Sequence, residues 1–156
     1  MPVLDLQQLN QFLAEHFPQG DQYGALEAVG CGTAVMRLAV SDQHLRPGGS
    51  VSGPAMMALA DVAVYAALLT RIGPVPLAVT SNLNISFLRK PLAGADLIAQ
   101  ARMLKVGRML GVGEVYLYSG AAAAAEGADP VAHATLTYAI PQPAAPSGNC
   151  SDQQET

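Results

Sequence analysis

Hydrophobic residues recur every three or four positions near the start of the chain, in residues 5–17. That spacing predicts an amphipathic helix. Asp5 can cap its first turn with Gln8 as capping-box partner, and Pro18 and Gly20 follow its end. We expect this helix to pack on the outside of the main body.

A second pattern is a long apolar run over residues 54–71, which follows a Gly-rich connection. Pro54 suits the first helical position, and Gly73 and Pro74 end the run. A helix that is apolar on all sides needs cover on all sides. The run is about long enough to approach a membrane span. Because Asp61 interrupts it, we expect a buried core helix.

Six other segments favour β-strands, because apolar and polar residues alternate or β-branched residues gather in them. They are residues 23–29, 33–40, 79–87, 95–106, 109–119 and 131–140. The late strands are joined by short turns, which predicts an antiparallel sheet. The fold class is therefore α+β, with the sheet against the long apolar helix. Either the sheet curls around this helix or a second subunit covers it.

Strand 79–87 has a regular alternation. It predicts that Val79, Leu83 and Phe87 share one face, and that Thr80 and Asn82 share the other.

The chain has 156 residues, which fits one domain with a sizeable core. We assign residues 1–140 to this domain. Residues 141–156 turn to Pro, Ala, Ser, Gly and Gln, and a disordered tail is expected there. Only 13% of the residues are charged, against about a quarter in an ordinary soluble chain. This indicates an oligomer interface, although an Ala-rich composition alone would also lower the charge.

The net charge of −4 argues against a nucleic-acid partner. Five of the eight Lys and Arg residues nevertheless lie between Arg89 and Arg108. They could meet an anionic small ligand or simply be solvated strand edges. Cys31 and Cys150 form neither a metal spacing nor a disulfide framework, and the first residues do not resemble a signal peptide. A cytoplasmic location, no metal and no membrane partner are therefore expected.

Between Gly53 and Thr70, Asp61 is the one charged residue. Burial of an unpaired carboxylate is costly, so we expect it to be hydrogen-bonded or to face a pocket that water reaches. A carboxylate beside a pocket is a candidate general base or nucleophile. The alternative is a structural Asp that caps a neighbouring loop.

The turn before this helix offers a partner for that chemistry. A helix N-terminus has free N–H groups and a partial positive charge, which can hold a developing oxyanion. Gly53 can present its N–H, whereas Pro54 has none. Asp61 lies eight residues further on, about 12 Å along the axis. Both groups could act on one atom if they came from two subunits, which the spacing alone does not show.

Four segments together resemble the hotdog-fold acyl-CoA thioesterases, in particular the phenylacetyl-CoA thioesterase-like branch. They are RPGGSVSGP followed by a helix with Asp61, then AVTSNLNISFLRKPLAG, KVGRML and VAHATLTYAI. The resemblance covers nearly all of the chain except the tail. It implies a curled antiparallel sheet wrapped around a long central helix. It also implies a homodimer or homotetramer whose active sites combine groups of two subunits.

The resemblance also implies roles for single residues. Asp61 stands where the family has its general base or nucleophile, and Gly53 where it has the oxyanion N–H. Thr80 matches the Ser or Thr that positions the nucleophilic water. The His-Gly-Gly motif of the family is replaced by Ser52-Gly53-Pro54, and the Ser52 hydroxyl could do part of the work of the histidine.

Further positions are expected to contact the substrate. Arg89, Lys90 and Arg108 are candidates for the phosphates of coenzyme A, by position only. Arg46, which replaces an Asn of the family, and Asn82 are assigned to substrate binding as well.

Met57, with Met56 and Leu59, could line a soft apolar pocket or belong to the core. Of the histidines, we expect His44 to be exposed and His133 to be a hydrogen-bonded strand residue.

The expected function is hydrolysis of a medium-chain or aromatic acyl-CoA, with coenzyme A as part of the substrate and no further cofactor. A non-catalytic acyl-CoA-binding protein is the alternative. A hydratase or dehydratase of the same fold is weaker, because no histidine stands in the motif.

Overall fold

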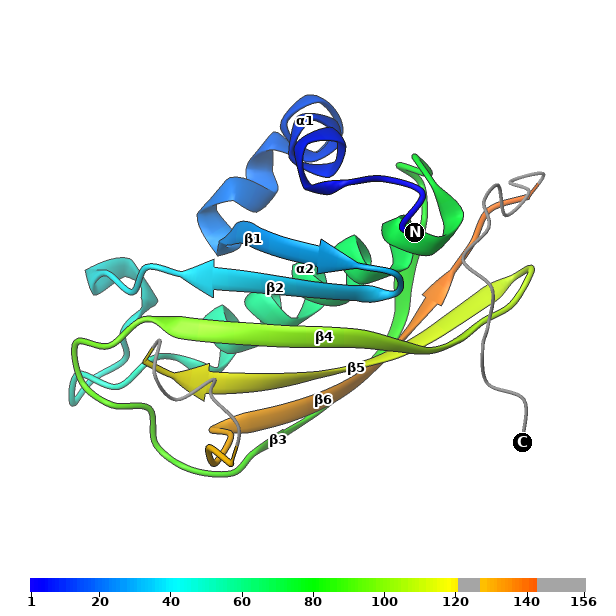
Figure 1. Ribbon diagram of the computed structural model, residues 1–156. Helices are drawn as coiled ribbons and strands as arrows, with labels where there is room; N and C mark the ends of the chain where they lie inside the picture. The colour runs from blue at the N-terminus through cyan, green and yellow to red at the C-terminus, as the bar shows by residue number, and fades with distance from the viewer. Residues whose placement is uncertain (121–126, 143–156) are drawn as a thin grey trace.

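The computed structural model describes residues 1–120 and 127–142. Its elements are α1 (Leu6–His16), the 3₁₀ helix η1 (Pro18–Tyr23), β1 (Ala25–Gly30), β2 (Thr33–Leu38), the 3₁₀ helix η2 (Asp42–His44), α2 (Gly53–Ile72), β3 (Val79–Phe87), β4 (Leu97–Val106), β5 (Leu110–Ser119) and β6 (Ala132–Ala139). The expected order of one helix, two strands, a long helix and four strands is confirmed (Figure 1). The two 3₁₀ helices were not foreseen.

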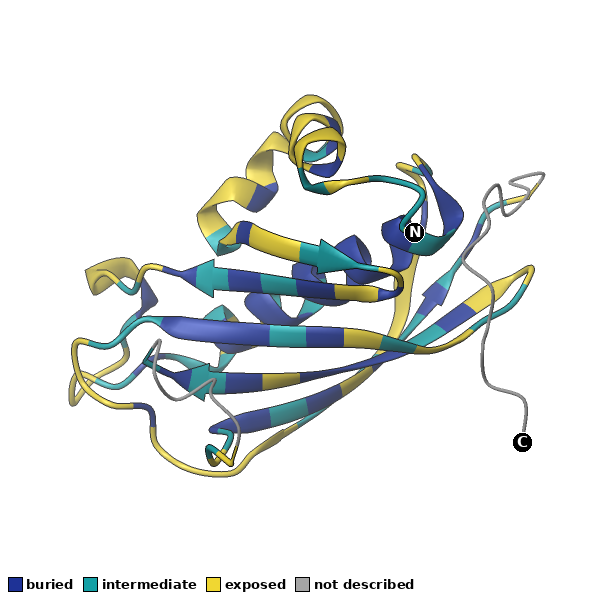
Figure 2. Cartoon of the chain, in the orientation of Figure 1, coloured by how far each residue is buried: buried dark blue, intermediate teal, exposed yellow. Residues whose placement is uncertain are grey.

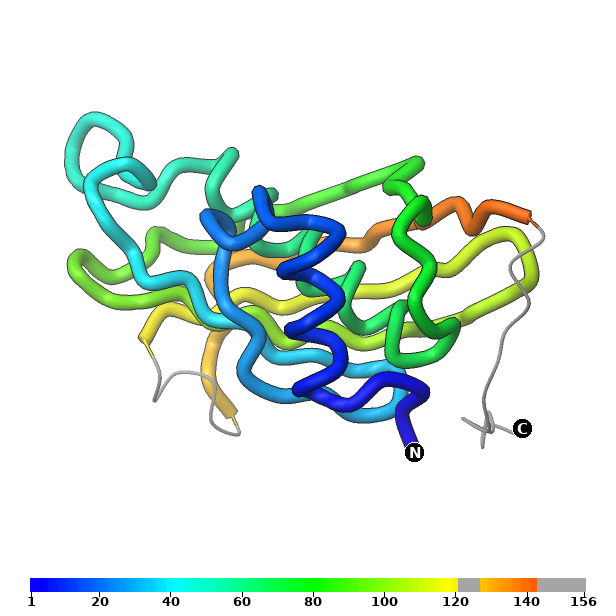
Figure 3. The backbone as a smooth tube through the Cα atoms, turned by 90° about the horizontal axis from the view of Figure 1, so that it is seen from above, coloured from blue at the N-terminus to red at the C-terminus, as the bar shows by residue number. Residues whose placement is uncertain are grey.

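All neighbouring strands are antiparallel, and their order across the sheet is β1-β2-β4-β5-β6-β3. The sheet curls, with α2 on its inner face and α1 beside β1 (Figures 1 and 3). Strand β3 lies at one edge, where its free backbone groups can pair with a further strand. The fold is thus α+β, as expected.

Helix α1 begins where the sequence indicated. The Asp5 side chain accepts from the Gln8 N–H at 2.8 Å, and the Gln8 side chain accepts from the Asp5 N–H at 2.9 Å. The first strand starts later than expected, at Ala25, because Tyr23 belongs to η1. Gly24 separates the two with φ of 147°, a conformation that favours glycine.

Helix α2 is the centre of the core and contacts all six strands as well as α1 and η1. It is long and apolar enough to cross a membrane by those two criteria alone, but 72% of its most apolar window is buried in the protein. Figure 2 shows the buried positions along the helix and the strands in front of it. The expected core helix is confirmed, and Met56 and Leu59 both belong to the core.

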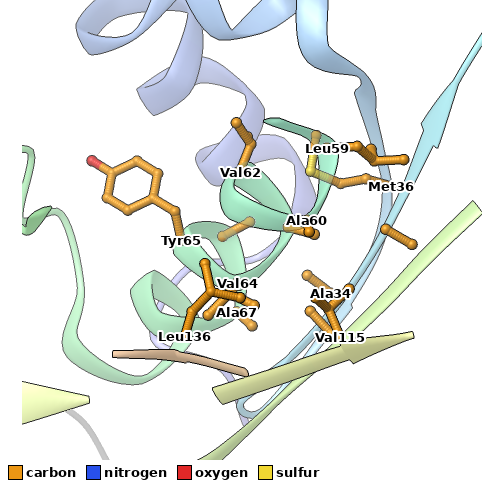
Figure 4. Close-up of a cluster of buried hydrophobic side chains, with 14 of the residues drawn as sticks. Ala34, Met36, Leu59, Ala60, Val62, Val64, Tyr65, Ala67, Val115 and Leu136 are labelled. Carbon is orange, nitrogen blue, oxygen red and sulfur yellow. The ribbon is translucent and has the colours of Figure 1, made fainter. Parts of the chain in front are cut away.

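Two glycines of β5 let this helix approach the sheet closely. A Cβ at Gly111 would lie 2.8 Å from Cδ1 of Leu68, and one at Gly113 would lie 2.9 Å from Cγ1 of Val64. Only the missing side chains leave room for these two helix residues. Figure 4 shows Val64 on the sheet side of α2, whereas Val62 and Tyr65 point away from the sheet.

The expected alternation in β3 is wrong at its start. The register shifts between Thr80 and Asn82, so that Ser81 bulges out of the ladder. Thr80 pairs with Tyr138 and Leu83 with Leu136, both on the face toward α2. Thr80 therefore shares the inner face with Leu83, and Val79 is on the other side. Because Ser81 is an extra residue in the strand, every position before it lies on the opposite face of the sheet from the one that simple alternation predicts.

Two further expectations need correction. His44 was expected to be exposed but is buried, because it sits in the short helix η2 below the start of α2. Cys31, in the β1–β2 turn, is disulfide-bonded, whereas no disulfide was expected. The expected disordered tail falls, apart from residues 141 and 142, outside the described residues.

Candidate active site

One stripe of α2 carries a row of candidate residues. Gly53, Met57, Asp61 and Tyr65 follow each other at intervals of four, so they lie along one side of the helix. Met57 is 38% exposed and lies between Gly53 and Asp61. The stripe therefore joins the helix start to the carboxylate.

The Asp61 carboxylate is held through one of its two oxygens. Oδ1 accepts a hydrogen bond from the Thr80 hydroxyl at 2.6 Å and one from the Tyr138 hydroxyl at 2.5 Å. The Tyr138 hydroxyl also lies 2.7 Å from the Asp61 backbone oxygen. Among the described residues, none donates a hydrogen bond to Oδ2. Asp61 is half-buried, so this second oxygen is the one available to a water molecule or a substrate.

A cavity of about 220 Å³ opens beside the carboxylate. We call it the Asp61 cavity, and its lining includes Asp61, Thr80, Tyr138, Tyr65, Val62 and Phe17. His16 also lines the cavity, and apart from its imidazole, the carboxylate and the hydroxyls, these walls are apolar. The cavity thus combines one charged group with an apolar surround, which is the usual composition of a small-molecule site.

Two tyrosines flank Asp61, and both remain protonated. Burial raises the pKa of Tyr138 far above its ordinary value, and the nearby negative charge of Asp61 raises it further. Burial raises the pKa of Tyr65 to about 12. The rings are stacked with centroids 5.9 Å apart, and the Tyr65 hydroxyl donates to the Pro76 backbone oxygen. Tyr138 is therefore a permanent hydrogen-bond donor toward Asp61.

The helix start is a second group of residues. Ser52 caps α2, because its side chain accepts from the Ala55 N–H at 3.3 Å, and its own N–H donates to the His44 backbone oxygen at 2.7 Å. Gly53 opens the helix, where backbone N–H groups lack an intrahelical partner. A Cβ on Gly53 would lie 3.4 Å from Cζ of Phe87. The ring at the end of β3 thus packs against the candidate oxyanion donor.

These two groups lie apart within one chain. Thr80 and Phe87 are seven residues apart on β3, about 23 Å at the rise of an extended strand. Gly53 and Asp61 are about 12 Å apart along α2. One chain brings together Asp61 with Thr80, and Ser52 with Gly53, but it does not bring the two pairs together.

The expected substrate-binding residues are scattered. Asn82 pairs with Thr137 on the outer face of the sheet, opposite to Thr80. Arg46 is exposed in the loop before α2, where its backbone bonds with Ser50 and Gly49. Neither lies in the Asp61 cavity.

The candidate phosphate contacts lie at opposite ends of the sheet. Arg89 and Lys90 follow β3, on the side of the helix start. The Arg89 guanidinium donates to the Pro130 backbone oxygen at 2.8 Å and lies 3.8 Å from an Asp129 oxygen. Arg108 lies in the β4–β5 turn and contacts the Gln142 side chain at 3.4 Å.

The histidines have separate roles. His133 is a hydrogen-bonded strand residue, as expected, and its Nε2 donates to Glu114 at 3.0 Å. Nδ1 of His44 accepts from the Ser41 N–H at 2.9 Å, and its buried Nε2 has no hydrogen-bond partner within the described part of the chain. Over residues 1–120 and 127–142, no cluster of His, Cys, Asp or Glu could hold a metal ion.

Tyr138 is the site residue that the sequence analysis missed. The signal was its place in the strand segment TLTYAI, where alternation puts it on the same face as Leu136. A tyrosine on a helix-facing position needs a partner for its hydroxyl. What the pattern could not show is that the partner is Asp61.

The model of the thioesterase superfamily matches residues 48–126, which include Gly53, Asp61 and Thr80. The match spans half of the chain, and the chain belongs to this superfamily. The recognition made from the four sequence segments is thus confirmed. No curated protein sequence matched the chain.

Solved structures agree with the family. A proposed thioesterase from Silicibacter is 48% identical, with 90% of this chain and 94% of that chain covered and a TM-score of 0.78. A variant of the phenylacetic acid degradation protein PaaI from Thermus thermophilus is 27% identical, with 80% and 99% covered and a TM-score of 0.67. A Streptococcus mutans protein bound to acetyl-CoA is 22% identical, with 76% and 88% covered and a TM-score of 0.64, and shows the fold alone. The fold is the hotdog fold.

Proposed function

We propose that the protein hydrolyses acyl-CoA thioesters with a medium-length or aromatic acyl group. The observation that carries the proposal is the Asp61 carboxylate, which is anchored at Oδ1 by Thr80 and Tyr138. Its Oδ2 has no hydrogen-bond donor among the described residues and lies beside a mostly apolar cavity. A carboxylate that only stabilised the fold would gain nothing from facing such a cavity. Membership of the thioesterase superfamily supports the same reaction.

In this reaction Asp61 acts in one of two ways. As a general base, Oδ2 takes a proton from water while the water oxygen attacks the thioester carbonyl. As a nucleophile, Oδ2 attacks the carbonyl itself, and water then hydrolyses the mixed anhydride. In both cases the carbonyl oxygen becomes an oxyanion, and collapse of the tetrahedral species breaks the C–S bond and releases the coenzyme A thiolate. The Gly53 N–H is the proposed donor to that oxyanion.

A second copy of the chain completes the proposed site. If two β3 edges pair in antiparallel fashion, centred between Leu83 and Asn84, Thr80 of one copy lies opposite Phe87 of the other. Phe87 packs on Gly53, so this pairing brings the helix start of one copy toward Asp61 of the other. The exposed side chains at the ends of β3, Val79 at 58% and Phe87 at 50%, would then gain cover.

Basic residues are the proposed partners of the coenzyme A phosphates. Arg89 and Lys90 are exposed next to the end of β3, near the helix start that holds the thioester in the proposed dimer. A protein of the same fold from Streptococcus mutans is bound to acetyl-CoA, which supports this class of ligand.

The alternative is a protein that binds acyl-CoA without hydrolysing it. The departure from the His-Gly-Gly motif favours this alternative. The Ser52 hydroxyl oxygen already accepts the capping hydrogen bond of α2, and Pro54 has no N–H to donate. Catalysis would then have been lost and binding retained.

Release of free thiol from a panel of acyl-CoAs tests the proposal, with purified wild-type protein beside Asp61→Asn. Asn keeps the size of the side chain but can neither take a proton nor attack. We expect hydrolysis by the wild type and a loss of at least about a hundredfold in the variant. Equal rates for both proteins on every substrate would contradict the proposed hydrolysis by Asp61. Tight binding of an acyl-CoA without turnover would establish the alternative.

Sedimentation of the wild-type protein tests the second copy. Leu83→Pro disrupts backbone pairing at the free edge of β3, and Leu83 does not contact the Asp61 carboxylate. Thr135→Pro is not a suitable control, because β6 is an inner strand of the sheet. We expect a dimer or larger assembly for the wild type and dissociation for Leu83→Pro. A monomeric wild type with full activity would contradict the shared site.

A further inference from the structure

A second cavity adjoins the Asp61 cavity. It has a volume of about 340 Å³ and lies between α1 with η1 on one side and β1, β2 and α2 on the other. We call it the α1 cavity. Its lining does not include Asp61, but Phe17 and Val62 line both cavities. The two cavities therefore meet at this pair of side chains.

Apolar side chains make most of the α1 cavity wall, among them Leu13, Leu26 and Met36. The polar residues in its lining, Asn10 and Asp21, are exposed and keep contact with water. Such a wall gains nothing from enclosed water and favours an apolar occupant.

Phe17 is held at the junction by the way α1 ends. Its N–H donates to the Leu13 backbone oxygen at 2.8 Å, and its backbone oxygen accepts from the Gly20 N–H at 3.0 Å. A Cβ on Gly20 would lie only 2.7 Å from Cδ1 of Phe17. The Phe17 ring can therefore take this position only because residue 20 is a glycine.

A row of aromatic rings leads from this junction to the carboxylate. The Phe17 ring meets Tyr65 edge-on, with centroids 6.3 Å apart, and Tyr65 stacks on Tyr138 at 5.9 Å. Tyr138 donates to Asp61. An acyl chain that starts at the reacting carbonyl beside Asp61 would thus follow these rings toward Phe17.

Cavity size points to the same path. The Asp61 cavity alone is smaller than the roughly 300–1,000 Å³ of ordinary ligand pockets, and the two together fall within that range. A short or aromatic acyl group can stay beside Asp61. A linear chain of medium length needs the second space.

We propose that the α1 cavity receives the distal carbons of a linear medium-chain acyl group and that Phe17, at the junction with Val62, determines the chain length that is accepted. This rests on the proposed thioesterase function, because it assigns the far end of the same substrate. Phe17 is a specificity-determining residue, because its ring lies between the Asp61 cavity, where the reaction takes place, and the α1 cavity, which receives the distal carbons.

Ala14→Trp tests the occupant. Ala14 lines the α1 cavity but not the Asp61 cavity, and it is exposed enough on α1 to accept a larger side chain. Gln11→Trp is the matched control, because Gln11 is an exposed residue of the same helix outside both linings. We expect Ala14→Trp to lower the ratio of kcat/KM for decanoyl-CoA to that for acetyl-CoA by at least about tenfold, and Gln11→Trp to leave the ratio as in the wild type. An equal ratio in Ala14→Trp and the control would overturn the proposal.

Phe17→Ala tests the junction. Removing the ring widens the junction between the cavities, so we expect kcat/KM for dodecanoyl-CoA to rise relative to that for octanoyl-CoA. A thermal melt of each variant shows whether it is folded, and Phe17→Leu keeps an apolar side chain should the alanine variant unfold. An unchanged length preference in a folded Phe17 variant would contradict the role given to the ring.

A binding measurement separates this inference from the proposed function. The thioether analogue of decanoyl-CoA cannot be hydrolysed, and its dissociation constant is measurable by calorimetry for wild type, Ala14→Trp and Gln11→Trp. If the wild type hydrolyses no thioester but Ala14→Trp alone weakens binding, the proposed function fails and the acyl site stands. If hydrolysis is found but all three proteins bind the analogue equally, the acyl site fails and the function stands.

Discussion

The Tyr138 hydroxyl lies 2.5 Å from Oδ1 of Asp61 and 2.7 Å from the backbone oxygen of the same residue. A strand residue 77 positions further along the chain thus contacts the helix carboxylate both at its side chain and at its backbone. This contact orients the carboxylate and ties β6 to the middle of α2.

Tyr138→Phe removes this hydroxyl and keeps the ring. A hydrogen bond to a charged group contributes roughly 1.5–3 kcal/mol, so we expect kcat to fall about tenfold or more with little change in KM. Tyr65→Phe is the matched control, because Tyr65 donates to Pro76 and not to Asp61. Steady-state kinetics on one acyl-CoA measure both variants, and an equal loss in the two would show that the hydrogen bond from Tyr138 to Asp61 has no specific part in the reaction.

Thr80 can be tested with two substitutions of opposite chemistry. Thr80→Val keeps the shape and loses the hydroxyl that donates to Oδ1 at 2.6 Å, whereas Thr80→Ser keeps the hydroxyl. We expect Val to lower kcat about tenfold and Ser to retain most of the activity. Both variants should fold, because Thr80 is exposed on an edge strand. If Val and Ser lose activity equally, the β-methyl group and not the hydroxyl matters.

The backbone N–H of Gly53 can be removed without removing the helix. Proline is tolerated in the first helical position, so Gly53→Pro should fold while it lacks the proposed oxyanion donor. We expect a loss of about a hundredfold or more in kcat. Gly53→Ala keeps the N–H and places a Cβ 3.4 Å from the Phe87 ring, which we expect to cost far less activity. Circular dichroism verifies the helix in both variants. Retained activity in Gly53→Pro would show that the Gly53 N–H is not the donor to the oxyanion.

The Glu114 carboxylate predicts a pH dependence of stability. The hydrogen bond from His133 holds the pKa of Glu114 below its ordinary value of 4.5, and Arg102 adds to the effect although burial opposes it. A carboxyl whose pKa is lowered in the folded state stabilises the fold above its unfolded pKa, and this contribution is lost as the pH falls through the folded-state value.

Glu114→Gln should therefore lower the free energy of unfolding by about 1 kcal/mol at neutral pH. The difference from the wild type should shrink as the pH falls below 4.5. Urea unfolding at a series of pH values measures it, with Glu27→Gln as a control on an exposed ion pair with Arg37. A difference that stays constant down to strongly acidic pH would contradict the linkage.

Local patterns were enough for the two α-helices and the six strands of the fold. The cap formed by Asp5 and Gln8 involves residues three apart, and its geometry follows from their identity. The apolar run of α2, interrupted by Asp61, predicted a core helix, because a helix apolar on all sides needs cover on all sides. Asp61 stood out for the same reason, as the one carboxylate in that run. The resemblance to a known family then supplied the hotdog fold, which periodicity alone leaves open.

Contacts between distant segments decided the rest. The bulge at Ser81 is set by pairing with β6, and it moves Thr80 to the face where Asp61 lies. The burial of His44 depends on how its loop folds under α2, which no alternation of residues encodes. Tyr138 and Phe17 approach the Asp61 cavity from the last strand and the first helix. Sequence spacing reports which neighbours share a helix or strand face, whereas partners from different elements meet only when the whole chain has packed.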